Sequence, residues 1–187
     1  MSEAQEALDA LIDPELPPTE WEFARAVVLV AKRAKISIAT AESLTGGLLS
    51  SLITSVPGSS EIFQGGVVAY TNFAKQKVLN IENALIQSGV VSTEVALAMA
   101  TNVSEVLDST LGLACTGVAG PDTQNAKPVG EVHIAVFDSQ TKSSRTQTMK
   151  FSGSRDDIRS QTCLALLGLC LDVMLPKTDL SRKPLGE

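Results

Sequence analysis

Residues 38–52, IATAESLTGGLLSSL, join an apolar run to a second apolar run through polar residues and two glycines. The β-branched residues around 36–40 predict a strand, and the pattern of 48–56 predicts a helix that a Pro-Gly pair ends. Residues 45–47, Thr-Gly-Gly, are expected to form the turn between them. The stretch is therefore read as a strand–turn–helix unit. Three polar residues follow its strand: Glu42, Ser43 and Thr45.

Strands and helices alternate along the rest of the chain. Helices are expected at 22–34, 72–79, 92–107 and 155–174, and further strands at 65–71, 111–117, 131–137 and 144–151. The last two strands, joined by a short polar turn, are expected to pair antiparallel. This order predicts an α/β fold: a single-domain mixed β-sheet flanked by helices, in a three-layer α/β/α sandwich.

The composition limits the possible ligands and surroundings. The 187 residues are 44% hydrophobic and 19% charged, which is typical of one globular domain. A net charge of −6 and only 4% aromatic residues argue against direct binding of nucleic acid. No apolar run is long enough to span a membrane, and the acidic N-terminus does not resemble a signal peptide. We expect a cytoplasmic protein without membrane contact, with a peripheral arm at 1–20 and a loose tail at 176–187.

Histidine and cysteine are scarce. The single histidine, His133, alternates with Val132 and Ile134 and is expected on the opposite, more polar face of its strand. The three cysteines lack CxxC spacing and are expected in the core: Cys115, Cys163 and Cys170. A zinc site made of histidine or thiolate ligands therefore lacks its residues, and a Ser-His-Asp triad has only one histidine available.

Polar and glycine residues follow three of the predicted strands. In open α/β sheets, ligands bind at the carboxyl ends of strands, so these residues are expected to line one pocket. The amides of 45–47 and of the Thr116–Gly117 turn are candidate donors to an anion. The expected pocket residues, besides the three already named, are Tyr70, Asn72, Lys75, Thr116, Gly117 and Gly120.

A reactive serine needs a base to remove its proton. With histidine nearly absent, the available bases near Ser43 are a desolvated Lys75 or a pair formed by Tyr70 and Lys75. A plainer interpretation remains open, in which Ser43 and Thr45 cap a helix and Lys75 is a solvated surface charge. The residues alone therefore indicate an α/β pocket with possible serine hydrolase chemistry.

Three motifs, in this order along the chain, resemble the CinA C-terminal domain family, the nicotinamide mononucleotide deamidases. They are AESLTGG, GGVVAYTNFAK and TGVAGPDTQNAKPVG, and the resemblance extends from about Glu22 to Met174. Departures from the common pattern concern loop shape: Phe73 and Ser154 stand where acidic residues are frequent, and Thr123-Gln124 where glycines are frequent. The resemblance makes 21–175 an amidohydrolase domain of this family.

The resemblance also implies an activity. Family members hydrolyse the carboxamide of nicotinamide mononucleotide to give nicotinic acid mononucleotide and ammonia, in pyridine nucleotide recycling, with no metal and no cofactor. Carried over, Ser43 is the nucleophile, and Tyr70 and Lys75 activate it. Substrate binding falls to Arg155, which matches an arginine before the last helix, and to the residues at the strand ends: Glu42, Thr45, Gly46, Asn72, Thr116, Gly117 and Gly120.

Two functions are carried forward. The first is an enzyme acting on a small nucleotide substrate, and the second is a nucleotide-binding or competence-related interaction module without turnover. The joint presence of Ser43, Tyr70 and Lys75 favours the enzyme, because a phosphate site needs no nucleophile. A mean hydropathy of +0.16 also leads us to expect a homo-oligomer.

Overall fold

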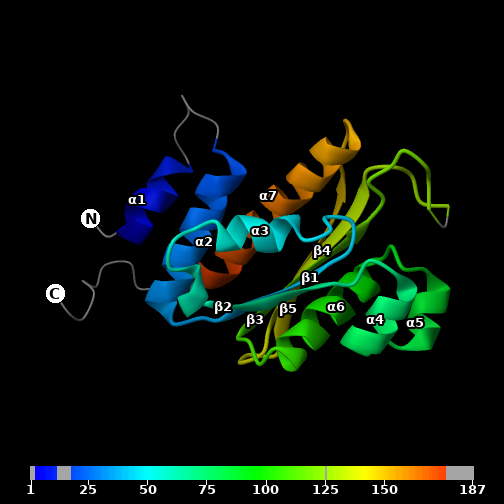
Figure 1. Cartoon of the computed structure of the whole chain (residues 1–187), viewed down its shortest axis with the longest axis horizontal. Helices are drawn as coiled ribbons and strands as arrows, with labels where there is room; N and C mark the ends of the chain where they lie inside the picture. Colours follow the sequence, from blue (N-terminus) through cyan, green and yellow to red (C-terminus); the bar gives the residue numbers. More distant parts are fainter. Residues whose placement is uncertain (1–2, 12–17, 125, 176–187) are drawn as a thin grey trace.

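The computed structural model describes residues 3–11, 18–124 and 126–175, and Figure 1 shows their arrangement. The elements follow one another as α1 (Glu3–Ala10), α2 (Glu20–Ala34), β1 (Ile38–Glu42), α3 (Leu48–Thr54), a 3-10 turn (Ser59–Glu61), β2 (Phe63–Val68), α4 (Asn72–Leu79), α5 (Asn83–Ser88), α6 (Thr93–Val106), β3 (Leu111–Gly117), β4 (Glu131–Asp138), β5 (Ser143–Lys150) and α7 (Arg155–Met174).

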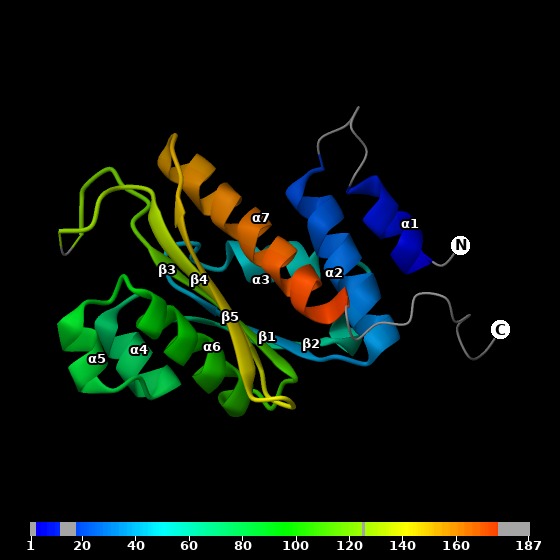
Figure 2. The same ribbon diagram turned by 180° about the vertical axis from the view of Figure 1, so that it is seen from behind.

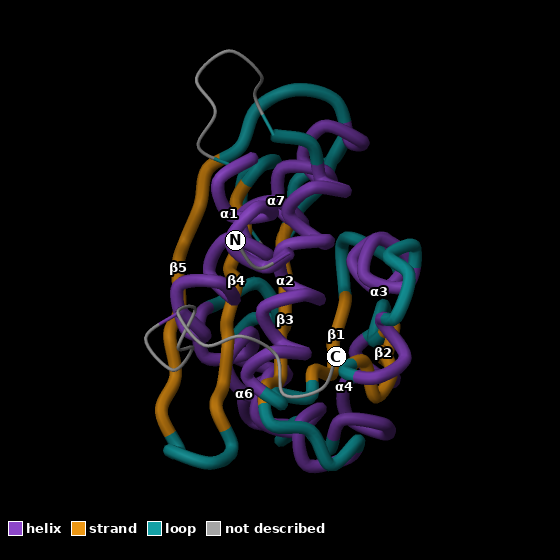
Figure 3. The backbone as a smooth tube through the Cα atoms, turned by 90° about the vertical axis from the view of Figure 1, so that its left-hand side faces the viewer, coloured by secondary structure: helices purple, strands orange, loops and turns teal. Residues whose placement is uncertain are grey.

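Five strands form one mixed sheet in the order β2-β1-β3-β4-β5, and Figure 3 shows them side by side. β1 pairs in parallel with both β2 and β3, whereas β3–β4 and β4–β5 are antiparallel. The predicted mixed sheet and its antiparallel last pair are confirmed. Because β1, β2 and β3 run in the same direction, their carboxyl ends lie at one edge of the sheet.

Helices cover both faces of the sheet, as Figures 1 and 2 show from opposite sides. One apolar core joins α1, α2, α3 and α7 to one face, through residues such as Ile38, Leu113 and Ile134. The other core joins α4, α5 and α6 to the second face, through Ala41, Ala114 and other residues. The alternation of side chains along each strand thus separates two cores, and the expected three-layer sandwich is confirmed.

The second face of the sheet carries small side chains, and α6 packs closely on it. A Cβ atom added at Gly112 would lie 1.9 Å from the carbonyl oxygen of Ala100 on α6. Ala39, Ala41 and Ala114 are buried on this face at β1 and β3, while the partner of Gly112 on β4 is Phe137. The distance between α6 and the sheet is therefore set by the absence of larger side chains here.

Most predicted elements are found within about two residues of their expected bounds. β1 begins at Ile38 instead of 36, because α2 ends with Lys35 in the left-handed region and Ile36 still bonds back to Ala31. α5 was not predicted; it has six residues and buries only Ile86, which is too little for a periodic pattern. None of the described helices is long and apolar enough to cross a lipid bilayer.

The structure describes part of the N-terminal end of the chain and none of the expected C-terminal tail. Within the expected arm at 1–20, α1 is a helix that buries Ala4 and Ala7 against the first core. The expected tail at 176–187 lies outside the described residues.

The cysteines lie in the core as predicted, and His133 lies on the opposite face of β4 from Val132 and Ile134. All three cysteines are free and buried. His133 lies on the α6 side of β4, where its Nδ1 is 3.0 Å from the Thr93 hydroxyl and its Nε2 is 3.1 Å from a Glu131 carboxylate oxygen. This face is polar at His133 but buried, since the residue is only 6% exposed.

Candidate active site

A cavity of about 160 Å³ lies at the edge where β1, β2 and β3 end. The loops after these strands and the segment before α6 form its wall. Seven of the predicted site residues line it: Ser43, Tyr70, Lys75, Thr116, Gly117, Gly120 and Arg155. Residues far apart in the sequence, such as Ser43 and Gly120, thus meet because the three strands are parallel.

The centre of the cavity is a direct contact between Ser43 and Lys75. Lys75 Nζ lies 2.9 Å from Ser43 Oγ and 2.9 Å from the carbonyl oxygen of Ala69. Ser43 follows β1 directly, and Lys75 lies in the first turn of α4, which the Thr71 hydroxyl caps at the Ala74 amide. Both side chains are buried, with residue exposures of 8% for Ser43 and 2% for Lys75. A nucleophile and a base are within hydrogen-bond distance.

The surroundings of Lys75 favour its neutral amine over its ammonium form. Burial lowers the pKa of Lys75 from 10.5 to about 8, because the ammonium loses hydration in this site. The nearby Cys115 is not a rival nucleophile, since burial raises the pKa of its thiol to about 11. A neutral Lys75 is therefore accessible near physiological pH, and its lone pair can accept the Ser43 proton.

The plainer interpretation of these side chains is wrong. The N-cap of α3 is Gly47, with no side-chain cap, so neither Ser43 nor Thr45 caps that helix. The Thr45 hydroxyl lies 3.2 Å from Cys115 Sγ instead. Lys75 is buried and not a solvated surface charge.

The carboxylate of Glu42 holds the turn that follows Ser43. Its two oxygens accept hydrogen bonds from the amides of Gly47, Leu49 and Ser50 at 2.8–3.1 Å, and from the Ser50 hydroxyl at 2.6 Å. Glu42 is completely buried. Of the 45–47 amides expected to bind an external anion, that of Gly47 is thus taken by Glu42 and that of Gly46 by the Ser43 carbonyl. For the Thr45 amide the expectation stays a prediction.

Arg155 connects two walls of the cavity. Its Nη2 donates to the Tyr70 hydroxyl at 2.7 Å, and its Nη1 donates to the Gly120 carbonyl at 2.7 Å. Tyr70 is 55% exposed, so this bridge lies at the mouth. No hydrogen bond joins Tyr70 to Ser43 among the described residues, whereas Lys75 is in direct contact with Ser43. Of the two predicted bases, Lys75 is thus the one that contacts the predicted nucleophile.

The other predicted residues have different positions. Thr116 donates its hydroxyl to the Val90 carbonyl at 2.8 Å and so ties β3 to the segment before α6. Four predicted binding residues are not among those that line the cavity: Glu42, Thr45, Gly46 and Asn72. Their roles in binding stay predictions.

Sequence reasoning missed several lining residues: Leu44, Val90, Val91, Val118, Ala119, Asp122 and Gln124. Those from 118 onward belong to the third motif, which was the available signal. Val90 and Val91 carried none, because they only precede the N-cap Ser92.

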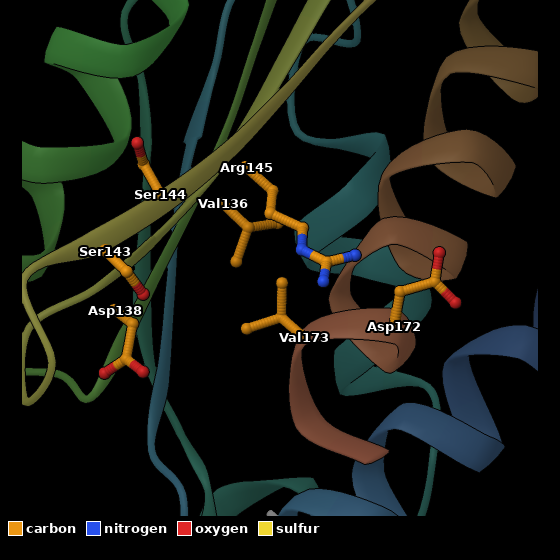
Figure 4. Close-up of a pocket in the computed structure, with 7 residues that line it drawn as sticks. All are labelled: Val136, Asp138, Ser143, Ser144, Arg145, Asp172 and Val173. Carbon is orange, nitrogen blue, oxygen red and sulfur yellow. The ribbon is translucent and has the colours of Figure 1, made fainter. Parts of the chain in front are cut away.

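A second cavity, of about 130 Å³, lies between the β4–β5 hairpin and α7 (Figure 4). Arg145 reaches from β5 towards α7, which carries Asp172. The described residues that line it include two serines but no lysine, histidine or tyrosine beside them. Asp138 is engaged in the hairpin turn, where it accepts the Thr141 hydroxyl at 2.8 Å. Of these two cavities, only the first therefore has a serine beside a lysine in its lining.

Comparison with known proteins agrees with the motifs. Residues 21–174 match the family model described as the CinA C-terminal domain. A CinA-like protein from Citrifermentans bemidjiense is 43% identical over 143 residues, which cover 75% of this chain and 34% of that protein. A CinA-like protein from Geobacter sp. is 40% identical over 153 residues, covering 81% of this chain and 36% of that protein. The chain thus spans about a third of the length of such curated relatives.

Solved structures show the same fold. The competence/damage inducible protein CihA from Agrobacterium tumefaciens has a TM-score of 0.80 and 32% identity, covering 84% of this chain and 97% of that one. A protein of the competence-damaged protein (CinA) superfamily from Escherichia coli has a TM-score of 0.77 and 28% identity, covering 83% and 90% of the two chains. The coverage of these neighbours corresponds to one complete domain.

Proposed function

Since this chain belongs to the CinA C-terminal domain family, we propose that it is a serine amidohydrolase that converts nicotinamide mononucleotide to nicotinic acid mononucleotide and ammonia, in pyridine nucleotide recycling. The observation that carries the proposal is the 2.9 Å contact between Lys75 Nζ and Ser43 Oγ inside the cavity. The resemblance of the three motifs to nicotinamide mononucleotide deamidases supplies the substrate.

The chemistry follows from the pair. Neutral Lys75 accepts the Ser43 proton while the oxygen attacks the carboxamide carbon, giving a tetrahedral intermediate. The intermediate collapses with cleavage of the C–N bond, and the Lys75 ammonium returns its proton to the leaving nitrogen, which departs as ammonia. Water, deprotonated by Lys75, then attacks the Ser43 ester. The ester C–O bond breaks, the Lys75 ammonium returns the proton to Ser43 Oγ, and the carboxylic acid is released. The enzyme returns to its starting state after one water is consumed.

The cavity suits the reacting end of this substrate. An apolar cavity of about 150 Å³ can hold a benzene ring, so the volume of about 160 Å³ suits one six-membered ring with its carboxamide. The ribose phosphate then extends to the mouth, where Arg155 offers a guanidinium. Arginine binds phosphate through paired N–H donors. Because α3 uses Glu42 at its N-terminus, Arg155 is the main candidate for the phosphate.

The direct test is ammonia release from purified protein incubated with a panel of pyridine nucleotides. Turnover of nicotinamide mononucleotide supports the proposal. The alternative, a nucleotide-binding or competence-related interaction module, predicts saturable binding with unchanged substrate. The buried Ser43–Lys75 contact favours the enzyme, because burying a lysine ammonium carries a cost that a binding site does not need.

The pH dependence of the reaction is a first prediction. With the pKa of Lys75 at about 8, kcat/KM is expected to rise as pH increases from 7 to 9 and to level off above that, since only the neutral amine accepts the proton. The substrate phosphate titrates near pH 6, about two units lower, and does not interfere. Initial rates of ammonia release in buffers of constant ionic strength give the profile. A flat or falling profile across this range contradicts the assignment of Lys75 as base.

The second prediction concerns the phosphate. Arg155→Gln is expected to raise KM for nicotinamide mononucleotide by about 10- to 100-fold, the value of a charge-assisted hydrogen bond. The same variant should leave kcat/KM for nicotinamide riboside, which lacks the phosphate, within about threefold of the parent. Arg145→Gln in the second cavity is the matched control, and its KM should not change. An equal loss for both substrates would show that Arg155 acts on Tyr70 and Gly120 and not on phosphate.

A further inference from the structure

The turn that carries the nucleophile, residues 43–47, is held from outside the cavity by two charged side chains. Glu42 takes the amide side, through Gly47 and the first residues of α3. Arg159, on α7, takes the carbonyl side: its Nε and Nη2 lie 3.3 and 2.8 Å from the carbonyl oxygen of Thr45. Arg159 does not line the cavity. It therefore reaches the nucleophile only through this turn.

This turn needs an external restraint because its own backbone is permissive. Gly46 and Gly47 both have left-handed conformations, with φ of 62° and 100°. Glycine reaches this region without strain but also leaves it easily. Two long backbone hydrogen bonds hold the peptide group between Thr45 and Gly46: its N–H donates to the Ser43 carbonyl at 3.2 Å, and its carbonyl accepts the Leu48 amide at 3.3 Å. The guanidinium of Arg159 adds a shorter, charge-assisted bond to the same carbonyl.

The position of Arg159 on α7 adds to the argument. It lies one helical turn after Arg155, so the same helix contacts the mouth of the cavity and the turn behind the nucleophile. The remaining nitrogen, Nη1, is bound to Asp156 at 2.9 Å on the exposed side of the helix. We infer that Arg159 is a positioning residue that holds the Ser43 turn in its reactive conformation. The inference rests on the proposed function of Ser43 as nucleophile.

The expected effect is on the chemical step. Arg159→Met keeps the apolar stem and removes the donors, so Ser43 Oγ shifts relative to Lys75 and to the bound carboxamide. A displacement of about 1 Å can cost about 100-fold in rate, and we expect a loss of about tenfold in kcat with KM within about threefold. Asp156→Asn is the matched control: it alters the other end of Arg159 without touching the turn, and kcat should stay within about twofold.

Chemical rescue separates positioning from general stability. Arg159→Ala leaves space for a guanidinium ion, and millimolar guanidinium chloride should restore part of its kcat. The same salt should not raise the rate of the parent protein or of Arg159→Met, whose side chain fills the space. Melting temperatures measured on the same samples show whether each variant is folded. A loss of melting temperature with unchanged kcat would mean that Arg159 only stabilises α7 against α3, and the inference would fall.

A second readout does not depend on the natural substrate. A fluorophosphonate probe reacts when Ser43 Oγ attacks phosphorus, fluoride leaves and the hydroxyl proton passes to Lys75. The rate of labelling, followed by mass spectrometry, is expected to fall about tenfold in Arg159→Met. If the parent protein is labelled but releases no ammonia from nicotinamide mononucleotide, the proposed function fails and the inference stands on the labelling rates. If labelling and turnover are both unchanged in Arg159→Met, the inference fails alone; if the parent shows neither reaction, both fail.

Discussion

Replacement of Ser43 by alanine is expected to lower kcat for deamidation by at least about 100-fold, the scale of losing a covalent route. The variant removes one oxygen, and with it the hydrogen bond that Lys75 donates at 2.9 Å. Substrate affinity should stay within about tenfold, because the contacts proposed for the ring and the phosphate do not use this oxygen. Ammonia release and binding of nicotinamide mononucleotide by calorimetry, on the same preparation, measure the two effects.

Thr45→Val is a suitable control for Ser43→Ala. It also removes a buried hydroxyl from the turn, one that bonds Cys115 and not Lys75. We expect it to cost about 1 kcal/mol of stability and to leave kcat within a few fold. Full turnover in Ser43→Ala with a lowered melting temperature would contradict the assignment of Ser43 as the nucleophile.

Replacement of Lys75 by methionine is expected to lower kcat by about 100-fold or more, since general base catalysis is lost, while raising the melting temperature at pH 7. The lowered pKa, from 10.5 to about 8, means that the folded state disfavours the ammonium. Each unit by which the pKa is lowered corresponds to about 1.4 kcal/mol, so the charged ammonium destabilises the folded state by roughly 3 kcal/mol. The two hydrogen bonds that are lost, to the Ala69 carbonyl and the Ser43 hydroxyl, contribute together about 2 kcal/mol. The difference corresponds to a rise of roughly 2–4 °C.

The stability gain in Lys75→Met should depend on pH in a defined direction. Between pH 8 and 10.5 the unfolded parent binds more protons than the folded parent, so the stability of the parent rises with pH. The advantage of the methionine variant should therefore shrink across this range. Denaturant titrations of both proteins at pH 7 and pH 10 measure it. Lys75→Arg, which keeps a charge that cannot readily be released, should be inactive without the gain.

The layered fold was predictable because its signals are local. The strand–turn–helix at 38–52 shows an apolar strand, two glycines and a helical pattern in adjacent residues, and the strand ends follow from the same pattern. The meeting of Ser43, Tyr70, Lys75 and Thr116 followed from one rule about the carboxyl ends of parallel strands. The position of Ser43 beside its candidate bases was therefore predictable from the strand pattern, whereas the catalytic roles proposed for these residues come from the family resemblance.

Other features of the site depend on side-chain directions that no local pattern encodes. Glu42 is the last residue of β1, and nothing in AESLTGG indicates the direction of its side chain. Its carboxylate accepts the amides of Gly47 and Ser50 at the start of α3, so these amides cannot bind a ligand. The burial of Lys75, which decides its pKa, arises because α4 packs against α6 and the lysine amine is enclosed beside Ser43 and the Ala69 carbonyl. Arg159 was missed because its partner, a backbone carbonyl 114 residues earlier, leaves no trace in sequence.

The close packing of α6 on Gly112 also bears on how substrate range can change. α6 begins at Thr93, immediately after Val90 and Val91, which form one wall of the cavity. Any side chain larger than hydrogen at 112 displaces Ala100, and with it the helix that carries this wall. The distance between α6 and the sheet thus helps to set the position of Val90 and Val91 in the cavity wall. A substitution in the core of this layer is therefore expected to change the shape of the cavity without replacing any residue that lines it.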